Sequence, residues 1–265
     1  MKTLNNRTAF VTGGASGIGL GIAKALASEG ANVAIADVQA DRLASALSEL
    51  QSITSSVMTL DVDVRDKASL EDASSRIESE LGPVSILCNN AGIGGGGKVL
   101  DTAEESWKNV IDINFWGVLN GIQVFLPGML ERGGPGHIVN TASFSGIQGH
   151  GHQSAYGSSK FAVVGLSEFL RNDLAETGVG VSVLCPHVVD TPILDGLRQR
   201  ASKQVLSLID GMAVSPDIVG QQVVSAMEQD ELYIFCDGVQ TREMLTKRCE
   251  TLLAAMDRQF PPAGE

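Results

Sequence analysis

A tyrosine and a lysine stand four residues apart, at Tyr156 and Lys160, in a stretch with a helical pattern. Side chains at this spacing lie one above the other on a helix face, often a solvated one. An ammonium group beside a phenol stabilises the phenolate, so we expect the pKa of Tyr156 to fall from about 10 toward the range of a general acid–base. Ser143 ends the preceding predicted strand, where side chains in parallel sheets hold ligands. Together the three residues predict acid–base catalysis.

A glycine-rich turn, Thr12-Gly13-Gly14-Ala15-Ser16-Gly17-Ile18-Gly19, separates the first predicted strand from a predicted helix. Glycines there permit a tight turn and a close approach of the backbone to a pyrophosphate, which meets the free N–H groups of the helix. Asp37 ends the second strand, where a carboxylate accepts hydrogen bonds from ribose hydroxyls and repels a 2′-phosphate. Neither Ala15 nor Ser16 offers the positive charge of an NADP pocket. We therefore expect NAD as cofactor.

A parallel sheet is needed to bring these residues together. Apolar runs without alternation are separated by helical patterns, as in a sheet covered by helices on both faces. The predicted fold class is α/β, a single doubly wound domain over residues 1–265 with about seven parallel strands. We expect the strands at 8–12, 33–36, 57–60, 84–88, 137–142, 181–185 and 232–235, a long helix at about 105–129, and a substrate lid at about 190–213.

The composition disfavours several classes of protein. The 265 residues are 43% hydrophobic and 19% charged, as in globular proteins, and the net charge of −12 disfavours nucleic acids and anionic membranes as partners. The apolar runs fall short of the roughly 20 residues of a membrane span, and the first residues contain no apolar signal region. The four cysteines are scattered without a CxxC pair, so we expect no metal site and a cytoplasmic location.

These motifs resemble those of the short-chain dehydrogenase/reductase family, from residue 7 to about 195. The family's TGxxxGxG reads Thr12 to Gly19, its NNAG reads Asn89 to Gly92, and its adenine-contacting Asp-Val reads Asp63-Val64. Asn114 fits the asparagine of the central helix and completes a tetrad with Ser143, Tyr156 and Lys160. The resemblance implies a Rossmann fold and a cofactor site made of Gly13, Ser16, Gly17, Ile18, Gly19, Asp37, Asp63, Val64, Asn90, Ala91, Gly92, Tyr156, Lys160, Pro186, Val189 and Thr191.

The resemblance also implies a mechanism. Tyr156 exchanges a proton with the substrate oxygen while the nicotinamide exchanges a hydride with the carbinol carbon, and Ser143 holds that oxygen. Lys160 holds the nicotinamide ribose and keeps the pKa of Tyr156 low. Asn114 fixes a water molecule that links Lys160 to solvent. The protein supplies orientation and electrostatics for this reaction.

The chain departs from the family's pattern at two places. The family usually has Pro-Gly after the sixth strand, whereas this chain has Pro186-His187. The imidazole of His187 either points into the substrate pocket or is a tolerated, partly exposed substitution, and both interpretations stay open. The glycine-rich C-terminal ending of many family reductases is replaced by residues 231–235 and a helix, which makes a role in fatty-acid synthesis less expected.

Loops around the predicted site indicate the substrate. Their apolar residues predict a hydrophobic secondary alcohol or ketone, with aromatic ones as candidates; these residues are Phe144, Ile147, Val188, Ile193 and Leu194. Segments 125–127, 136–139 and 231–235 are loosely similar to bacterial dehydrogenases that oxidise benzylic alcohols of lignin-type aryl ethers. The resemblance implies a homodimer or homotetramer. The alternative is a catalytically silent NAD-binding regulator, whereas a sugar epimerase or dehydratase is disfavoured by the length of the chain.

Overall fold

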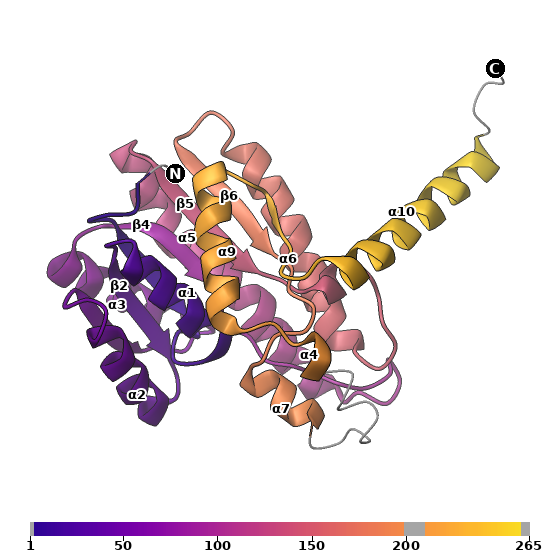
Figure 1. Ribbon diagram of the computed structural model, residues 1–265, viewed down its shortest axis with the longest axis horizontal. Helices are drawn as coiled ribbons and strands as arrows, with labels where there is room; N and C mark the ends of the chain where they lie inside the picture. Colours follow the sequence, from indigo (N-terminus) through magenta and orange to yellow (C-terminus); the bar gives the residue numbers. More distant parts are fainter. Residues whose placement is uncertain (1–2, 199–209, 261–265) are drawn as a thin grey trace.

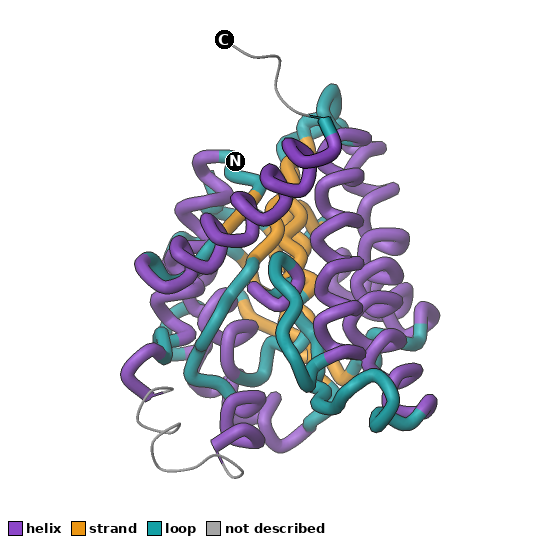
Figure 2. Tube along the Cα trace, turned by 90° about the vertical axis from the view of Figure 1, so that its right-hand side faces the viewer, coloured by secondary structure: helices purple, strands orange, loops and turns teal. Residues whose placement is uncertain are grey.

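Seven parallel strands form one sheet with helices on both faces in the computed structural model, which describes residues 3–198 and 210–260 (Figures 1 and 2). The strand order is β3-β2-β1-β4-β5-β6-β7, so the predicted doubly wound α/β fold is confirmed. The predicted strand positions are also confirmed to within two residues at each end. The strands are β1 (Thr8–Thr12), β2 (Asn32–Asp37), β3 (Val57–Asp61), β4 (Val84–Asn89), β5 (Gly136–Thr141), β6 (Val179–Leu184) and β7 (Tyr233–Ile234).

The helices lie in two layers, one on each face of the sheet (Figure 2). Residues of α1, α2 and α9 share one buried cluster with the sheet, and residues of α3, α5 and α6 share the other. The helices are α1 (Gly17–Ser28), α2 (Ala40–Gln51), α3 (Lys67–Leu81), α4 (Glu104–Ile111), α5 (Gly117–Arg132), α6 (Ser154–Asp173), α7 (Pro192–Arg198), α9 (Pro216–Gln229) and α10 (Val239–Gln259), with a π-helical turn η1 (Asp112–Trp116) and a 3₁₀ turn η2 (Phe144–Gly146).

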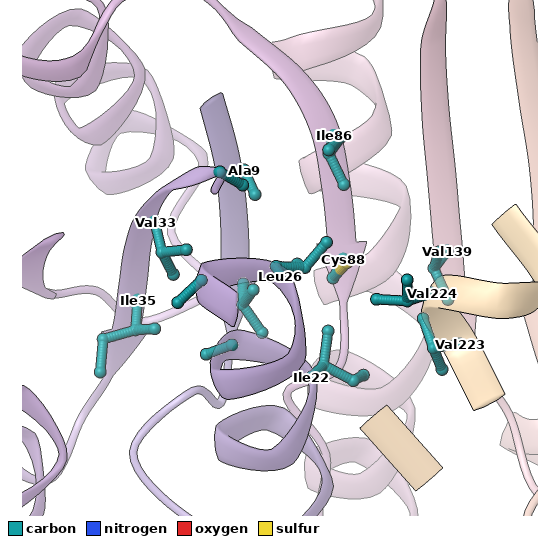
Figure 3. Packing of buried hydrophobic residues seen from close by; sticks show 14 of the residues in the cluster. Ala9, Ile22, Leu26, Val33, Ile35, Ile86, Cys88, Val139, Val223 and Val224 are labelled. Atoms are coloured by element: carbon teal, nitrogen blue, oxygen red, sulfur yellow. The ribbon is translucent and has the colours of Figure 1, made fainter. Parts of the chain in front are cut away.

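The absence of alternation in the strand sequences follows from burial on both faces. In β1, Ala9 and Val11 belong to the cluster under α1, while Phe10 points to the opposite face and packs against Phe125 with ring centroids 4.9 Å apart. Figure 3 shows the first cluster, where Ile22 and Leu26 of α1 lie over the apolar side chains of the strands. Because every β1 residue is buried, the strand requires apolar residues in succession.

The predicted long helix is interrupted at its centre. Residues 105–129 form α4, η1 and α5 in place of one regular helix, and the Gly117 N–H bonds to the Asp112 carbonyl five residues back. Such a π turn accommodates one extra residue. The pattern of apolar residues predicted a helix here but not this turn. By length and composition alone, one stretch among the described helices, Glu104–Arg132, could cross a membrane, a test that the core helix of a soluble protein also passes. Its residues Val118, Ile122 and Phe125 pack in the second cluster, as in a helix that covers a sheet.

Helices α1 and α9 touch through their backbones. A Cβ added at Gly21 would lie 2.1 Å from the Pro216 carbonyl oxygen, and one added at Gly220 would lie 2.1 Å from the Gly21 carbonyl oxygen. No side chain fits at either position. Ser215 caps α9, because its hydroxyl accepts the Asp217 N–H at 3.2 Å. The crossing joins the segment after the glycine turn to the C-terminal part of the chain.

The C-terminal helix α10 leaves the body of the protein (Figure 1). Thr241, in its first turn, is its one buried residue among those described. Further along, Leu252, Leu253 and Met256 are 56%, 63% and 59% exposed. The later part of α10 therefore carries exposed apolar side chains.

Candidate active site

The carboxyl ends of β1, β4 and β5 are joined by hydrogen bonds around the glycine turn. The Thr12 hydroxyl accepts the N–H groups of Asn90 and Ala91, both at 3.0 Å. The Asn90 side-chain amide donates to the carbonyls of Thr12 and Gly13 at 3.1 and 3.2 Å, and its oxygen accepts the Thr141 hydroxyl at 3.2 Å. Sequence reasoning assigned Asn90 to the cofactor site. In the structure its side chain fastens the turn that faces that site.

The residues around this turn fit a dinucleotide. Gly13 and Gly17 have φ of +61° and +53°, a backbone conformation that favours glycine. The N-cap of α1, Ser16, makes no side-chain cap, and the first turn carries no acidic residue, so its N–H groups can receive a pyrophosphate. Asp37 ends β2 and is half-buried, with Oδ1 accepting the Gln39 N–H at 3.1 Å. The phosphate end and the ribose end of the predicted site therefore share one edge of the sheet.

The predicted adenine contact, Asp63-Val64, lies in the loop after β3. Arg65 holds the Asp63 carboxylate through Nε at 3.0 Å and Nη2 at 2.6 Å, and these bonds lower the pKa of Asp63. Val64 is buried against Gly117, where an added Cβ would lie 2.6 Å from Val64 Cγ2. The ion pair of Asp63 with Arg65 was not predicted from the sequence, although an arginine two residues after an aspartate is close enough to pair with it.

The loop after β6 reaches the glycine turn from the other side. The Pro186 carbonyl accepts the Phe144 N–H at 2.8 Å and, more weakly, the Ser143 hydroxyl at 3.4 Å. Val189 forms a bridge with Val214, and a Cβ added at Gly17 would lie 3.0 Å from Thr191 Cγ2. The predicted nicotinamide-side residues therefore lie beside the pyrophosphate turn.

Part of the predicted lid at 190–213 lies outside the described residues, at 199–209. Its described ends are tied together, because Arg198 pairs with Asp190 at 2.6 Å and with Asp210 at 2.8 Å. These ion pairs were not predicted from the sequence, because the partners lie 8 and 12 residues from Arg198 and meet only when the loop folds.

Ser143, Tyr156 and Lys160 meet at the end of β5. The Ser143 hydroxyl lies close enough to the Tyr156 hydroxyl to lower the pKa of the tyrosine, and Lys160 Nζ lies 5.7 Å from the centroid of the Tyr156 ring. Lys160 is buried and donates to the Thr141 carbonyl at 2.8 Å. Its burial lowers the pKa of the lysine to about 8.

The expected lowering of the tyrosine pKa is wrong for this arrangement. Desolvation raises the pKa of Tyr156 above its ordinary value, and the hydrogen bond from Ser143 offsets only part of that increase. The physical reason is that burial of the Tyr156 hydroxyl disfavours the charged phenolate, while the Lys160 ammonium group is turned toward a backbone carbonyl. The spacing of four residues predicted the proximity correctly, but it could not predict the desolvation of both groups.

Asn114 is placed by the π turn and is fully buried. Its Oδ1 accepts the Ile93 N–H at 2.9 Å, while Nδ2 donates to the Ile93 carbonyl at 3.0 Å and to Ser159 Oγ at 3.1 Å. A Cβ added at Gly92 would lie 3.3 Å from Asn114 Oδ1 and 3.4 Å from Lys160 Nζ. The asparagine thus fixes the loop after β4 beside the lysine. The water relay through Asn114 stays a prediction.

The apolar loop residues that the sequence assigned to the substrate pocket differ in their exposure. Phe144 and Leu194 are buried, Ile147 and Val188 are half-buried, and Ile193 is 52% exposed. Among residues 3–198 and 210–260, no group of three or more His, Cys, Asp or Glu could hold a metal ion.

Comparisons with known proteins agree with this geometry. Residues 7–202 match the family model described as short chain dehydrogenase. The 1-deoxy-11-beta-hydroxypentalenate dehydrogenase of Streptomyces exfoliatus is 36% identical over 89% of this chain and 84% of its own length. The C alpha-dehydrogenase of Sphingobium sp. strain SYK-6 is 30% identical over 96% of this chain and 87% of its own. A short chain dehydrogenase/reductase of Burkholderia phymatum, solved in complex with NAD, is 29% identical with a TM-score of 0.85 over 100% of this chain and 99% of its own.

We predict that Asn114→Ala destabilises the protein by about 1–3 kcal/mol, because two backbone groups of Ile93 lose their partner in a buried place. Chemical denaturation measures the loss. Asn109→Ala is the matched control, since Asn109 lies in α4 near the same turn but is exposed, and it should change stability by less than about 0.5 kcal/mol. Equal effects of the two substitutions would contradict the positioning role.

Proposed function

Because this chain belongs to the short-chain dehydrogenase family, we propose that it is an NAD-dependent oxidoreductase of hydrophobic secondary alcohols and ketones. The match to the family model and the similarity to named dehydrogenases indicate an oxidoreductase with a Rossmann fold. The proposal of alcohol and ketone chemistry rests on one observation: Ser143, Tyr156 and Lys160 lie together beside the glycine turn. We take the whole chain, 1–265, as one catalytic domain.

In the proposed mechanism, Tyr156 exchanges the proton and Ser143 positions the substrate oxygen. The Tyr156 hydroxyl gives its proton to a ketone oxygen in reduction, and the phenolate takes the proton of the alcohol in oxidation. Ser143, which lies beside the Tyr156 hydroxyl, would turn its own hydroxyl from the Pro186 carbonyl to donate to the same oxygen. Lys160, whose Nζ lies 5.7 Å from the centroid of the Tyr156 ring, stabilises the phenolate. A nicotinamide, when bound, supplies or accepts the hydride.

The substrate class is inferred from the apolar side chains around Ser143. Ile193 is 52% exposed, and Ile147 and Val188 are half-buried, so apolar side chains of these loops are open to a ligand. The similarity to the C alpha-dehydrogenase of Sphingobium supports the resemblance to dehydrogenases of benzylic alcohols. Aromatic secondary alcohols are therefore the first compounds to assay.

Asp37 is the basis for proposing NAD over NADP. It stands at the end of β2, and the next residue along the chain is the exposed Val38, which offers no positive charge to a 2′-phosphate. The similarity to a protein solved with NAD supports the same choice. A carboxylate that meets a phosphate in this place would be a like-charge clash.

The second candidate function is a cofactor-binding regulator without catalysis. Asn90 and the glycine turn would serve such a protein equally well. What favours an enzyme is the burial of Lys160 beside Tyr156, because burying an ammonium group costs stability and a binding protein does not need it.

We also propose that the protein works as a homodimer or homotetramer in which α10 lies on a second copy. The helix carries four basic and three acidic residues, whereas the whole chain has a net charge of −12. An acidic second copy therefore attracts the slightly basic helix α10 and repels the acidic remainder of the first copy. On α6, Phe161 and Phe169 lie on one face with open space at Gly165 between them, and Phe169 is 74% exposed. Arg248 of α10 covers Phe161 of its own chain at 5.4 Å and leaves Phe169 to the partner.

A cytoplasmic location is proposed on the state of the cysteines. Cys88, Cys185 and Cys236 are buried and free, and Cys249 is exposed and free. Such usage is typical of proteins in a reducing compartment.

We predict that the unmodified protein prefers NAD over NADP by at least about tenfold in kcat/KM, equivalent to about 1.4 kcal/mol. Asp37→Ala should narrow this ratio, because it removes the charge that opposes the 2′-phosphate. Initial rates with each cofactor measure it. Equal use of both cofactors by the unmodified protein would overturn the assignment.

Tyr156→Phe keeps the ring and removes the ionisable hydroxyl. We expect turnover to fall by about 10² or more, because proton transfer contributes about 10²–10⁴, while NADH still binds through the glycine turn and Asp37. A spectrophotometric assay over a panel of alcohols, together with NADH fluorescence titration, tests both parts. A variant that retains most of its turnover would favour the regulator.

Leu252→Glu should reduce the oligomer to a smaller species, because it places a charge in the apolar contact of α10. Phe169→Glu should do the same from the receiving side. Ala254→Glu adds the same charge on the opposite, exposed face of α10 and should leave the mass unchanged. Light scattering after size exclusion gives the masses, and an unmodified protein that is monomeric would contradict the assembly.

A further inference from the structure

His187 lies next to the reacting groups, at the position where the family's pattern has glycine. It follows Pro186, whose carbonyl accepts the Ser143 hydroxyl and the Phe144 N–H. The imidazole meets the Phe144 ring edge to face, with centroids 5.6 Å apart, and its side chain is 24% exposed. The ring is therefore a half-buried polar group on the apolar surface beside Ser143.

A carboxylate stands behind one side of the ring. His187 Nδ1 lies 3.7 Å from Asp237 Oδ2, and the other oxygen, Asp237 Oδ1, accepts the Thr241 hydroxyl. Thr241 is the buried residue at the start of α10, so Asp237 is anchored where the C-terminal helix begins. The separation of 3.7 Å is longer than a hydrogen bond, but it orients the ring electrostatically and favours the tautomer with the proton on Nδ1.

The opposite nitrogen, Nε2, is available to a ligand. The described residues give it no hydrogen-bond partner, and it is absent from the buried polar atoms that lack one, so it is open to solvent. Burial and His150 lower the pKa of His187, while Asp237 raises it, and burial has the largest effect. The ring is thus neutral at neutral pH. With Nδ1 protonated, Nε2 is a hydrogen-bond acceptor.

We propose that His187 Nε2 forms a substrate subsite for a hydroxyl group other than the one that reacts. The preferred substrate is then a hydrophobic secondary alcohol, or the matching ketone, that carries a second hydroxyl group. Asp237 and Thr241 are positioning residues, because they act on the substrate only through the orientation of the ring. This inference rests on the proposed function and names the substrate class more narrowly.

Two alcohols of the same skeleton test the subsite. These are 1-phenylpropan-1-ol and 1-phenylpropane-1,3-diol, which share the reacting secondary alcohol and differ in the second hydroxyl. We expect the unmodified protein to prefer the diol by about tenfold in kcat/KM, the effect of one hydrogen bond of about 1.4 kcal/mol. His187→Phe should abolish the preference and leave the rate on the monoalcohol within about threefold, because the ring still packs on Phe144. His187→Gln, which keeps an acceptor, should restore part of the preference.

Asp237→Asn tests the positioning role through a readout that needs no activity. The NMR titration of His187 should show a lower pKa in this variant, because the charge that raises it is gone. The diol preference should fall with it. Glu243→Gln is the matched control: it removes an exposed charge early in α10 and should move neither measurement.

Three results would overturn the subsite. If His187→Phe slows both alcohols equally, the ring only packs against Phe144. If the unmodified protein oxidises the monoalcohol and the diol with equal kcat/KM, the subsite is wrong while the proposed function stands. If it oxidises neither alcohol, the proposed substrate class fails and the subsite fails with it. Melting temperatures of all variants show whether each one is folded.

Discussion

The hydroxyl of Thr12, which accepts two backbone N–H groups from the end of β4, is the contact on which the rest of the site depends. β1 and β4 are neighbours at the point where the strand order reverses, and the connections leave these strands in opposite directions. Ligands of such sheets bind at this point, and the Thr12 bonds join the ends of the two strands there. From Ala91 the chain continues to Ile93, which Asn114 holds beside Lys160. The turn for the cofactor and the lysine of the reaction centre therefore share one rigid frame.

Among residues 3–198 and 210–260, no carboxylate pairs with Lys160, and this affects the chemistry of the site. A carboxylate partner would keep the ammonium protonated and compensate its charge. The Thr141 carbonyl holds it by a neutral acceptor, so the positive charge stays available to whichever anion forms nearby. The phenolate of Tyr156 is that anion. The raised pKa of the tyrosine and the lowered pKa of the lysine are two results of the same desolvation.

The arrangement of the strands could be predicted because burial on both faces forces apolar residues into succession, as β1 illustrates. The meeting of Ser143, Tyr156 and Lys160 could be predicted because helix spacing and strand ends are local rules. Features that depend on residues far apart in the sequence could not be predicted. The π turn adds one residue without disturbing apolarity, and the contact of Asp237 with His187 joins positions fifty residues apart. The departure of α10 from the body has no local signal either.

The crossing of α1 and α9 limits how such enzymes can be recombined. At Gly21 and Gly220 each helix is opposed by backbone atoms of the other, so no neighbouring side chain can shrink to make room for a methyl group. Helix α1 follows the glycine turn, and helix α9 follows the loop at Pro186. The two helices are thus matched to each other, because the distance between their backbones leaves no room for a side chain. A chimera that takes its N-terminal half from one relative and its C-terminal half from another keeps this crossing only if both parents have glycine there. Exchange of substrate specificity between relatives is therefore easier by grafting loops than by exchanging halves.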